Sequence, residues 1–297
     1  MEKRLVIDYE KSYSLFEKAI KKFQLKKVIY RILFKGKGLE FEGYRDYRED
    51  DDFYSIDWKA TLRAGKKMIK QYKEERDVVV YFLVDASKRM LFGSGKKLKA
   101  EFCGEVICVL ANLVVNSGDK ASLILFADKL IKFIPPSSSK EQIFIFKEAL
   151  SNLNNYGGEF DLENCIKFSF LNAAKFSSNS FVLASDFLHF KKSYEKDLPL
   201  LFSKGDFFSL MIRDKMDEDL PSIDESLLFK NPFSEKKILV NPSIIREKFR
   251  VNALKQKEFV KSIFKRSGVD LLELKNGDDF VLSLANFIKK RAEEMRI

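Results

Sequence analysis

The sequence contains a single histidine, His189, among 297 residues. Nucleophilic catalysis through a serine or cysteine would therefore depend on this one base, and the chain has no G-x-S-x-G turn to present a serine. His189 follows a predicted strand and is interpreted as a surface or loop residue. We therefore do not expect an enzyme that works through a Ser-His or Cys-His pair.

Cysteines and long apolar runs are also scarce. Cys103, Cys108 and Cys165 are odd in number, lack C-x-x-C spacing and fall in apolar helical patterns, so we expect buried free thiols rather than disulfides or zinc ligands. The longest apolar run, 78–84, has the length of a strand, whereas a membrane-spanning helix needs about 20 residues. The first residues are charged throughout and lack the apolar block of a signal peptide. We expect a cytoplasmic protein that does not bind a membrane.

Acidic residues are outnumbered, with 44 Asp and Glu against 54 Lys and Arg, and the net charge is +10. Such a charge suits a partner with an acidic face, nucleic acid included. The lysines, however, are spread along the whole chain, without an arginine-rich or aromatic-interleaved stripe. A lysine-rich proteome accounts for this pattern better, so nucleic acid is not an expected partner.

What the chain does have is an alternation of strands and helices from residue 77 onward. Strands are predicted at 78–84, 121–127, 130–134 (stopped by Pro135-Pro136), 180–185, 207–213 and 269–274, and a hairpin at 227–229 and 237–240. Helices are predicted at 96–115, 141–153, 161–175, 194–203, 244–266 and 278–295. This alternation predicts an α/β fold, with a Rossmann-like, mostly parallel sheet flanked by helices.

Two segments precede this α/β region of residues 77–297. Residues 1–34 are predicted to be a helical lead, because 15–34 combine helical apolar spacing with lysines. Residues 35–76 are dense in charges and aromatics and are predicted to form a small β-rich appendage. It contains the block Ile56-Asp57-Trp58-Lys59-Ala60-Thr61.

Two segments resemble known binding motifs but lack residues or spacing that those motifs require. Gly93-Ser94-Gly95-Lys96 lacks the first glycine of a phosphate-binding loop and has Lys97 where a Mg²⁺-binding Ser or Thr is required. The acidic run 49–52 lacks the spacing of a calcium loop. It is interpreted as a solvated charge cluster, paired with Arg45 or Arg48.

The most informative stretch is Asp85-Ala86-Ser87-Lys88-Arg89, directly after the first core strand. Ligands of open α/β sheets bind beyond the carboxyl ends of strands, where Asp85 and Ser87 would point oxygens suited to Mg²⁺ into the crevice. Asp186, directly after strand 180–185, would add another. The alternative interpretation is that Asp85 and Ser87 cap the following turn and helix.

With these residues the chain resembles the bacterial family catalogued as domain of unknown function 58 (DUF58). That family combines a block like G-x-G-x-E-F-x-x-x-R-x-Y, an acidic pair and I-D-W-K-A-T-A-R with a von Willebrand factor A-like (vWA-like) strand and D-x-S-x-S-M turn. The matching residues are Gly36, Gly38, Glu40, Phe41, Arg45, Tyr47, Asp51, Asp52, residues 56–61, Arg63, Lys70, Glu74, Glu75, Arg76, Asp85, Ser87, Met90, Phe92 and Gly93. The resemblance covers nearly the full length. It implies a vWA-type fold for 77–297 and a role beside a MoxR-type AAA+ ATPase in assembling or activating client proteins.

The resemblance is incomplete at the metal position, where Arg89 replaces the second serine and Glu159 stands in place of a threonine. A guanidinium at this point repels Mg²⁺ or pairs with Asp85. Alternatively, Arg89 turns outward, and Glu159 or Asp161 becomes a ligand. We therefore expect no cofactor. The weaker alternative is a Mg²⁺ site made of Asp85, Ser87, Asp186 and Glu159.

The family residues of the upstream block are interpreted as structural, because nothing near them can serve as a nucleophile. Ile56 and Trp58 are predicted to pack and to anchor the appendage. Asp57 is predicted to be a buried carboxylate paired with Arg63 or Arg45. The residues of this block are Arg45, Tyr47, Asp51, Asp52, Asp57, Trp58 and Arg63.

The sequence therefore predicts a non-enzymatic adaptor. Its crevice would engage the carboxylate or acidic face of a partner, with Lys88 and Arg89 supplying positive charge. The alternatives are a metal-dependent hydrolase that uses Asp85, Asp186 and Glu159, and a nucleic-acid-binding protein that uses the basic charge.

Overall fold

The computed structural model describes residues 4–22, 39–48, 51, 56–74, 78–173, 179–199, 205–234 and 236–294. The helices are α1 (Tyr9–Lys22), α3 (Trp58–Ala64), α4 (Lys99–Asn116), α5 (Glu141–Ser151), α6 (Leu162–Ala173), α8 (Pro242–Arg266) and α9 (Phe280–Glu294). The strands are β1 (Leu39–Asp46), β2 (Met68–Glu74), β3 (Val79–Asp85), β4 (Lys120–Phe126), β5 (Leu130–Ser137), β6 (Asn179–Ser185), β7 (Asp206–Arg213), β8 (Leu227–Lys230), β9 (Lys237–Val240) and β10 (Asp270–Lys275).

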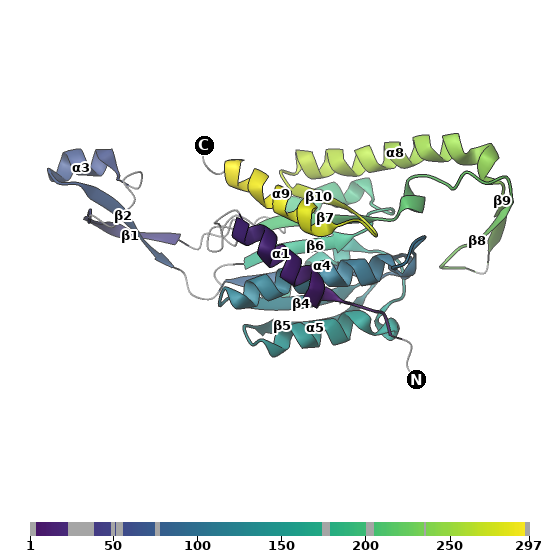
Figure 1. The fold of residues 1–297 in the computed structure, drawn as a ribbon, viewed down its shortest axis with the longest axis horizontal. Coiled ribbons are helices and arrows are strands. Elements are labelled where there is room, and N and C mark those ends of the chain that lie inside the picture. The colour runs from purple at the N-terminus through teal and green to yellow at the C-terminus, as the bar shows by residue number, and fades with distance from the viewer. Residues whose placement is uncertain are drawn as a thin grey trace.

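Six strands form the central sheet in the order β10-β7-β6-β3-β4-β5 (Figure 1). All neighbouring pairs are parallel except β4 with β5. Counted along the chain, this is the doubly wound order 3-2-1-4-5-6, whose direction reverses between β3 and β6. The predicted α/β fold with a mostly parallel sheet is confirmed, and the reversal directs attention to the carboxyl ends of these two strands.

The sheet is covered on both faces, which explains why the four inner strands β3, β4, β6 and β7 are buried along nearly their whole length. Every residue of β3 is buried, and its side chains divide between two core clusters on opposite faces of the sheet. Helix α4 lies in one cluster, where α1 packs against it and Leu5, Ile7 and Phe16 join the core.

The three cysteines are buried free thiols, as predicted. No helix in the described ranges has both the length and the apolar character to cross a membrane.

Two predicted boundaries were wrong. Pro135 and Pro136 do not stop the third strand, because β5 continues to Ser137. It is an edge strand, where a residue without an N–H is tolerated. The predicted helix 194–203 is, in its described part, the 3₁₀ helix η4 (Lys192–Lys196), followed by helical residues 198–199. Of the predicted helix 15–34, only the part within α1 lies in the described residues.

The appendage is a two-stranded antiparallel sheet of β1 and β2, with α3 between them in sequence. It is separate from the six-stranded sheet (Figure 1). The predicted hairpin is also confirmed, with β8 and β9 paired antiparallel.

Candidate functional site

Asp85, the last residue of β3, is completely buried at the point where the sheet order reverses. One carboxylate oxygen accepts a hydrogen bond from the Ser87 amide (2.8 Å), and the other accepts one from the Ser185 hydroxyl (2.6 Å). Burial, reinforced by the charge of Asp186, raises the pKa of Asp85 to about 6. Asp85 therefore joins the ends of β3 and β6.

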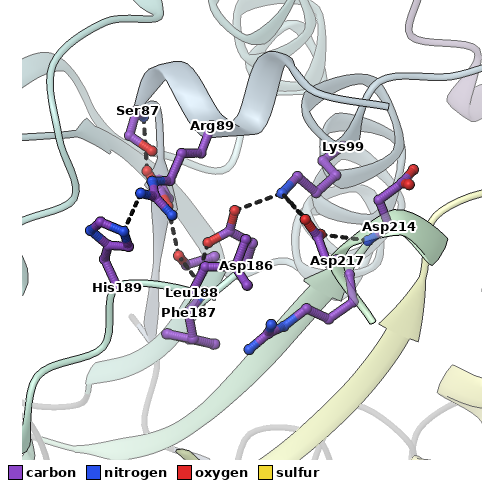
Figure 2. A network of polar contacts seen from close by, with 12 residues as sticks. Ser87, Arg89, Lys99, Asp186, Phe187, Leu188, His189, Asp214 and Asp217 are labelled. Carbon is purple, nitrogen blue, oxygen red and sulfur yellow. Dashed lines mark hydrogen bonds and ion pairs between the residues drawn. The ribbon is translucent and has the colours of Figure 1, made fainter. Parts of the chain in front are cut away.

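Asp186, the residue after β6, makes the most buried ion pair of this region (Figure 2). The Lys99 ammonium lies 2.6 Å from Asp186 Oδ2, and the two side chains are 1% and 2% exposed. The other Asp186 oxygen accepts a hydrogen bond from the Leu188 amide (2.9 Å). Lys99 also lies 3.0 Å from Asp217 at the end of the 3₁₀ helix η5 (Lys215–Asp217), which follows β7. One lysine from α4 thus connects the carboxyl ends of β6 and β7.

Burial and the neighbouring charges shift the pKa values of Lys99 and its two carboxylate partners in different directions. Burial by itself would lower the pKa of Lys99, but Asp186 and Asp217 outweigh it and raise that pKa. Burial also opposes the charge of Asp186, yet Lys99 holds the pKa of Asp186 below its usual value. For Asp217, burial prevails and the pKa is raised. Of the two carboxylates, Asp186 is also the nearer to the Lys99 ammonium, at 2.6 Å against 3.0 Å for Asp217.

We call the buried cluster of Asp85, Ser87, Asp186 and Lys99 the crevice, and Arg89 lies at its outer side (its rim), where it is partly exposed. Its guanidinium contacts the Nε2 atom of His189 and lies 5.2 Å from the centre of the Phe233 ring. It does not pair with Asp85, which was one of the two arrangements that the sequence left open. Burial lowers the pKa of Arg89, and the charges of Asp186, Asp85 and Glu159 oppose that shift only in part. Its neighbour Lys88 is exposed. These two side chains give the rim a positive charge.

The loop with Glu159 lies beside the Asp85 turn. The Gly157 amide donates to the Ala86 carbonyl (2.8 Å), and the Lys88 amide donates to the Gly158 carbonyl (3.3 Å). Glu159 itself is exposed. The Ser87 hydroxyl is buried without a hydrogen-bond partner among the described residues, so it does not cap the following 3₁₀ helix η2 (Lys88–Leu91).

The donor set does not fit a divalent metal as a resident cofactor. Both oxygens of Asp85 are engaged in hydrogen bonds, and Asp186 already has an ammonium group at 2.6 Å. A cation bound to Asp186 would meet the repulsion of Lys99 in a buried setting, where charge interactions are strong. Of the other predicted ligands, the Ser87 hydroxyl is buried without a geometric hydrogen-bond partner among the described residues, and the Glu159 side chain is exposed.

The family residues of the appendage form a second, partly buried set of interactions. Arg45 pairs with Asp51 through contacts of 2.5 and 2.6 Å, which confirms the predicted pairing with Arg45 for this residue of the run 49–52. Asp52 lies outside the described residues. Lys67 lies over the ring of Tyr47, at 5.4 Å from its centre.

Two predictions for the I-D-W-K-A-T block were wrong. Asp57 does not pair with Arg63 or Arg45: it is the N-cap of α3, accepting from the amides of residues 59 and 60, and it pairs with Lys70 at 3.3 Å. A carboxylate at this position satisfies helix amides that lack an internal partner. Ile56 is buried as predicted, but Trp58 is 54% exposed because it starts the helix on its outer side.

Sequence reasoning missed Lys99. It lies on the buried face of α4, four and seven residues before Cys103 and Val106. A lysine at helical spacing from core positions signals a buried cation that needs a carboxylate partner. The pattern did not identify that partner, because Asp186 lies 87 positions away.

Comparisons with known proteins cover both regions. The family model described as "Protein of unknown function DUF58" matches residues 43–259. "Uncharacterized protein Rv1480" from Mycobacterium tuberculosis is 18% identical over 260 residues, which cover 87% of this chain and 81% of that protein. Among solved structures, the hypothetical protein BatB from Bacteroides thetaiotaomicron is similar with a TM-score of 0.46 and 14% identity, over 73% of this chain and 99% of that one. A von Willebrand factor type A structure from Catenulispora acidiphila has a TM-score of 0.36 and 11% identity, over 75% of this chain and 44% of that one.

Proposed function

The chain belongs to the DUF58 family, and from that premise we propose that it is a non-enzymatic adaptor whose crevice binds an acidic segment of a partner protein. The partner we propose is a MoxR-type AAA+ ATPase, as the family resemblance implies, acting on client proteins in the cytoplasm. The adaptor would bring the client and the ATPase together without any chemical step of its own.

The observation that carries this proposal is the position of Arg89. Its guanidinium is held at the rim by His189 and Phe233, while the carboxylates behind it already have partners of their own. A partly exposed guanidinium with a fixed orientation is suited to bind a carboxylate through two parallel hydrogen bonds. Lys88 adds a second exposed positive charge beside it.

The same geometry favours binding over hydrolysis. Asp85 and Asp186 have both of their carboxylate oxygens engaged, so neither is placed to activate a water molecule. His189 contacts the guanidinium of Arg89, and that cation lowers the pKa of His189 in addition to the effect of burial. These contacts support the adaptor over the metal-dependent hydrolase.

The test is direct binding between the purified chain and the MoxR-type ATPase of the same organism, measured by calorimetry with ATP present. Arg89→Glu should weaken binding at least tenfold, because it reverses the charge that meets the partner's carboxylate. Lys265→Glu is the matched control. It makes the same change of charge at the end of α8 that leads into β10, on the opposite edge of the sheet, and should leave affinity within twofold.

Equal loss in both variants would show that only overall charge matters, and no binding by the wild-type chain would overturn the proposed partner. Metal-dependent hydrolysis that disappears in Asp85→Ala would favour the enzyme instead. Binding to duplex DNA that falls steeply with salt concentration would favour the nucleic-acid alternative.

A further inference from the structure

We propose that the ammonium group of Lys99 is the resident cation of the crevice, and that it makes recognition at Arg89 independent of divalent metal ions. The second half of this statement rests on the proposed function; the first half concerns the isolated chain. The resemblance to vWA-like domains implies a metal ion that would hold the residues of the crevice together. Here a side chain of the protein does so.

The position of Lys99 is determined by the helix that carries it. Lys99 is the first residue of α4, and its side chain is 1% exposed. Its ammonium lies 2.6 Å from Asp186 after β6 and 3.0 Å from Asp217 after β7. A divalent ion at such a place would likewise hold carboxylates from neighbouring strand ends together.

The second carboxylate is itself held in place. Asp217 Oδ2 accepts a hydrogen bond from the Asp214 amide (2.8 Å) (Figure 2). The Asp214 carboxylate in turn accepts from the Ser94 hydroxyl (2.5 Å) and the Asn276 amide group (3.0 Å). The ammonium group therefore sits among fixed oxygens. A buried charge is tolerated when it is paired and hydrogen-bonded in this way.

Lys99 also accounts for the state of the remaining ligand candidates. With Asp186 neutralised, Asp85 is left as a buried carboxylate without an ion pair, and it uses the Ser87 amide and the Ser185 hydroxyl instead. The Ser87 hydroxyl is left without a partner among the described residues. These oxygens have the identity of a metal site, but the negative charge of Asp186 is already balanced by the ammonium group of Lys99.

Arg89 is the competing candidate for the resident cation, because it replaces a serine of the D-x-S-x-S turn. Its contacts run outward, to His189 and Phe233, and it is partly exposed. Lys99 is the group with a direct carboxylate contact. The two roles separate: Lys99 stabilises the crevice, and Arg89 faces the partner.

Binding of Mn²⁺ alone to the purified chain, followed by electron paramagnetic resonance, tests this assignment. The wild type and Arg89→Ser should show no saturable binding at millimolar Mn²⁺, since Lys99 remains in both. The double variant Arg89→Ser/Lys99→Met should bind Mn²⁺ at least tenfold more tightly than Arg89→Ser does. It has the second serine of the D-x-S-x-S turn and lacks the ammonium group beside Asp186. Arg89→Ser/Lys97→Met is the matched control and should behave like Arg89→Ser, since Lys97 pairs with Glu105 and not with Asp186.

Saturable binding by the wild type, or gain of binding in Arg89→Ser alone, would overturn the assignment to Lys99. So would a folded Arg89→Ser/Lys99→Met protein that binds no Mn²⁺. Should that variant not fold, the wild type and Lys99→Arg decide the question, because both keep the cation and both must remain free of bound metal.

The partner assay separates this inference from the proposed function. Binding of the ATPase to the chain is measured under two conditions: with Mg²⁺ and an excess of ATP, and with EDTA and nucleotide but no metal ion. If the affinity is the same under both conditions, both proposals stand. If the ATPase binds only when free Mg²⁺ is present, and Asp186→Asn abolishes that binding, then recognition depends on a metal ion. The further inference then fails, while the adaptor function stands. If nothing binds, the function fails, and the Mn²⁺ result still decides the role of Lys99.

Discussion

The crevice and the appendage both hold charged residues in ion pairs, but at opposite extremes of burial. Lys99 and Asp186 are 1% and 2% exposed, whereas Lys66 and Asp46 in the appendage are 60% and 61% exposed. Water and salt screen the exposed pair, which contributes about 0–1 kcal/mol. Breaking a buried pair leaves an uncompensated charge in a poorly solvated place and costs about 3–5 kcal/mol. The same residue types thus maintain the geometry of the crevice and contribute little to the stability of the appendage.

The largest expected effect comes from removing one partner of the buried pair. Asp186→Ala should lower the free energy of unfolding by about 3 kcal/mol, because Lys99 keeps only Asp217 as its partner. Asp46→Ala, in the exposed pair, should lower it by no more than about 1 kcal/mol. Urea denaturation followed by circular dichroism measures both. Equal losses would contradict the contrast between the two regions.

Asp85 in the crevice and Asp51 in the appendage should contribute to the pH dependence of stability with opposite signs. Burial raises the pKa of Asp85 to about 6, so between pH 3.8 and 6 the folded chain keeps a proton that the unfolded chain releases, and stability falls as pH rises through this window. Hydrogen bonds from Arg45 lower the pKa of Asp51 to about 2, so its contribution is present above pH 3.8 and is lost as pH falls.

Urea unfolding at several pH values between 4 and 7 checks this sign. The fall in stability with rising pH should be smaller in Asp85→Asn than in the wild type, and unchanged in Asp51→Asn. An Asp85→Asn protein with the wild-type pH profile would show that Asp85 ionises in the folded chain as it does in the unfolded one.

Two glycines with positive φ allow a finer comparison. Gly158 (φ 65°) lies in the crevice loop, and a Cβ atom there would come within 2.2 Å of Asp128 Oδ1. Gly65 (φ 69°) ends α3 with open space around it. Alanine at Gly65 meets only the left-handed backbone strain, about 1 kcal/mol. Alanine at Gly158 must also displace Asp128, for about 2 kcal/mol in total. Thermal unfolding of both variants should give the larger loss at Gly158, and the reverse order would be inconsistent with a tightly packed crevice loop.

The smallest effect is expected on the outer side of α3. Leu62 is 83% exposed, so Leu62→Ala should change the free energy of unfolding by less than about 0.5 kcal/mol. Urea denaturation measures this change. A loss above about 1 kcal/mol would mean that the appendage packs against another part of the chain through this face.

Much of the fold could be predicted from local patterns. Apolar runs of strand length predicted all six strands of the sheet, most clearly the inner ones, because strands buried on both faces are mostly apolar. Pro135-Pro136 misled the prediction of β5, since only the tertiary position of that strand, at the edge, makes proline tolerable. In the appendage, Asp57 was expected to be buried with an arginine, but the start of a helix at Trp58 made it an N-cap.

The position of the candidate site followed from the sequence alone. A polar turn after the first core strand, and Asp186 after a later one, must lie at the carboxyl edge of a parallel sheet, so Asp85 and Asp186 were predicted to be neighbours. The identity of the cation beside them was decided by the tertiary structure. Lys99 and Asp186 are 87 positions apart, and only the packing of α4 on the sheet brings them to 2.6 Å. Burial then makes their pairing necessary, because neither charge is stable there without the other.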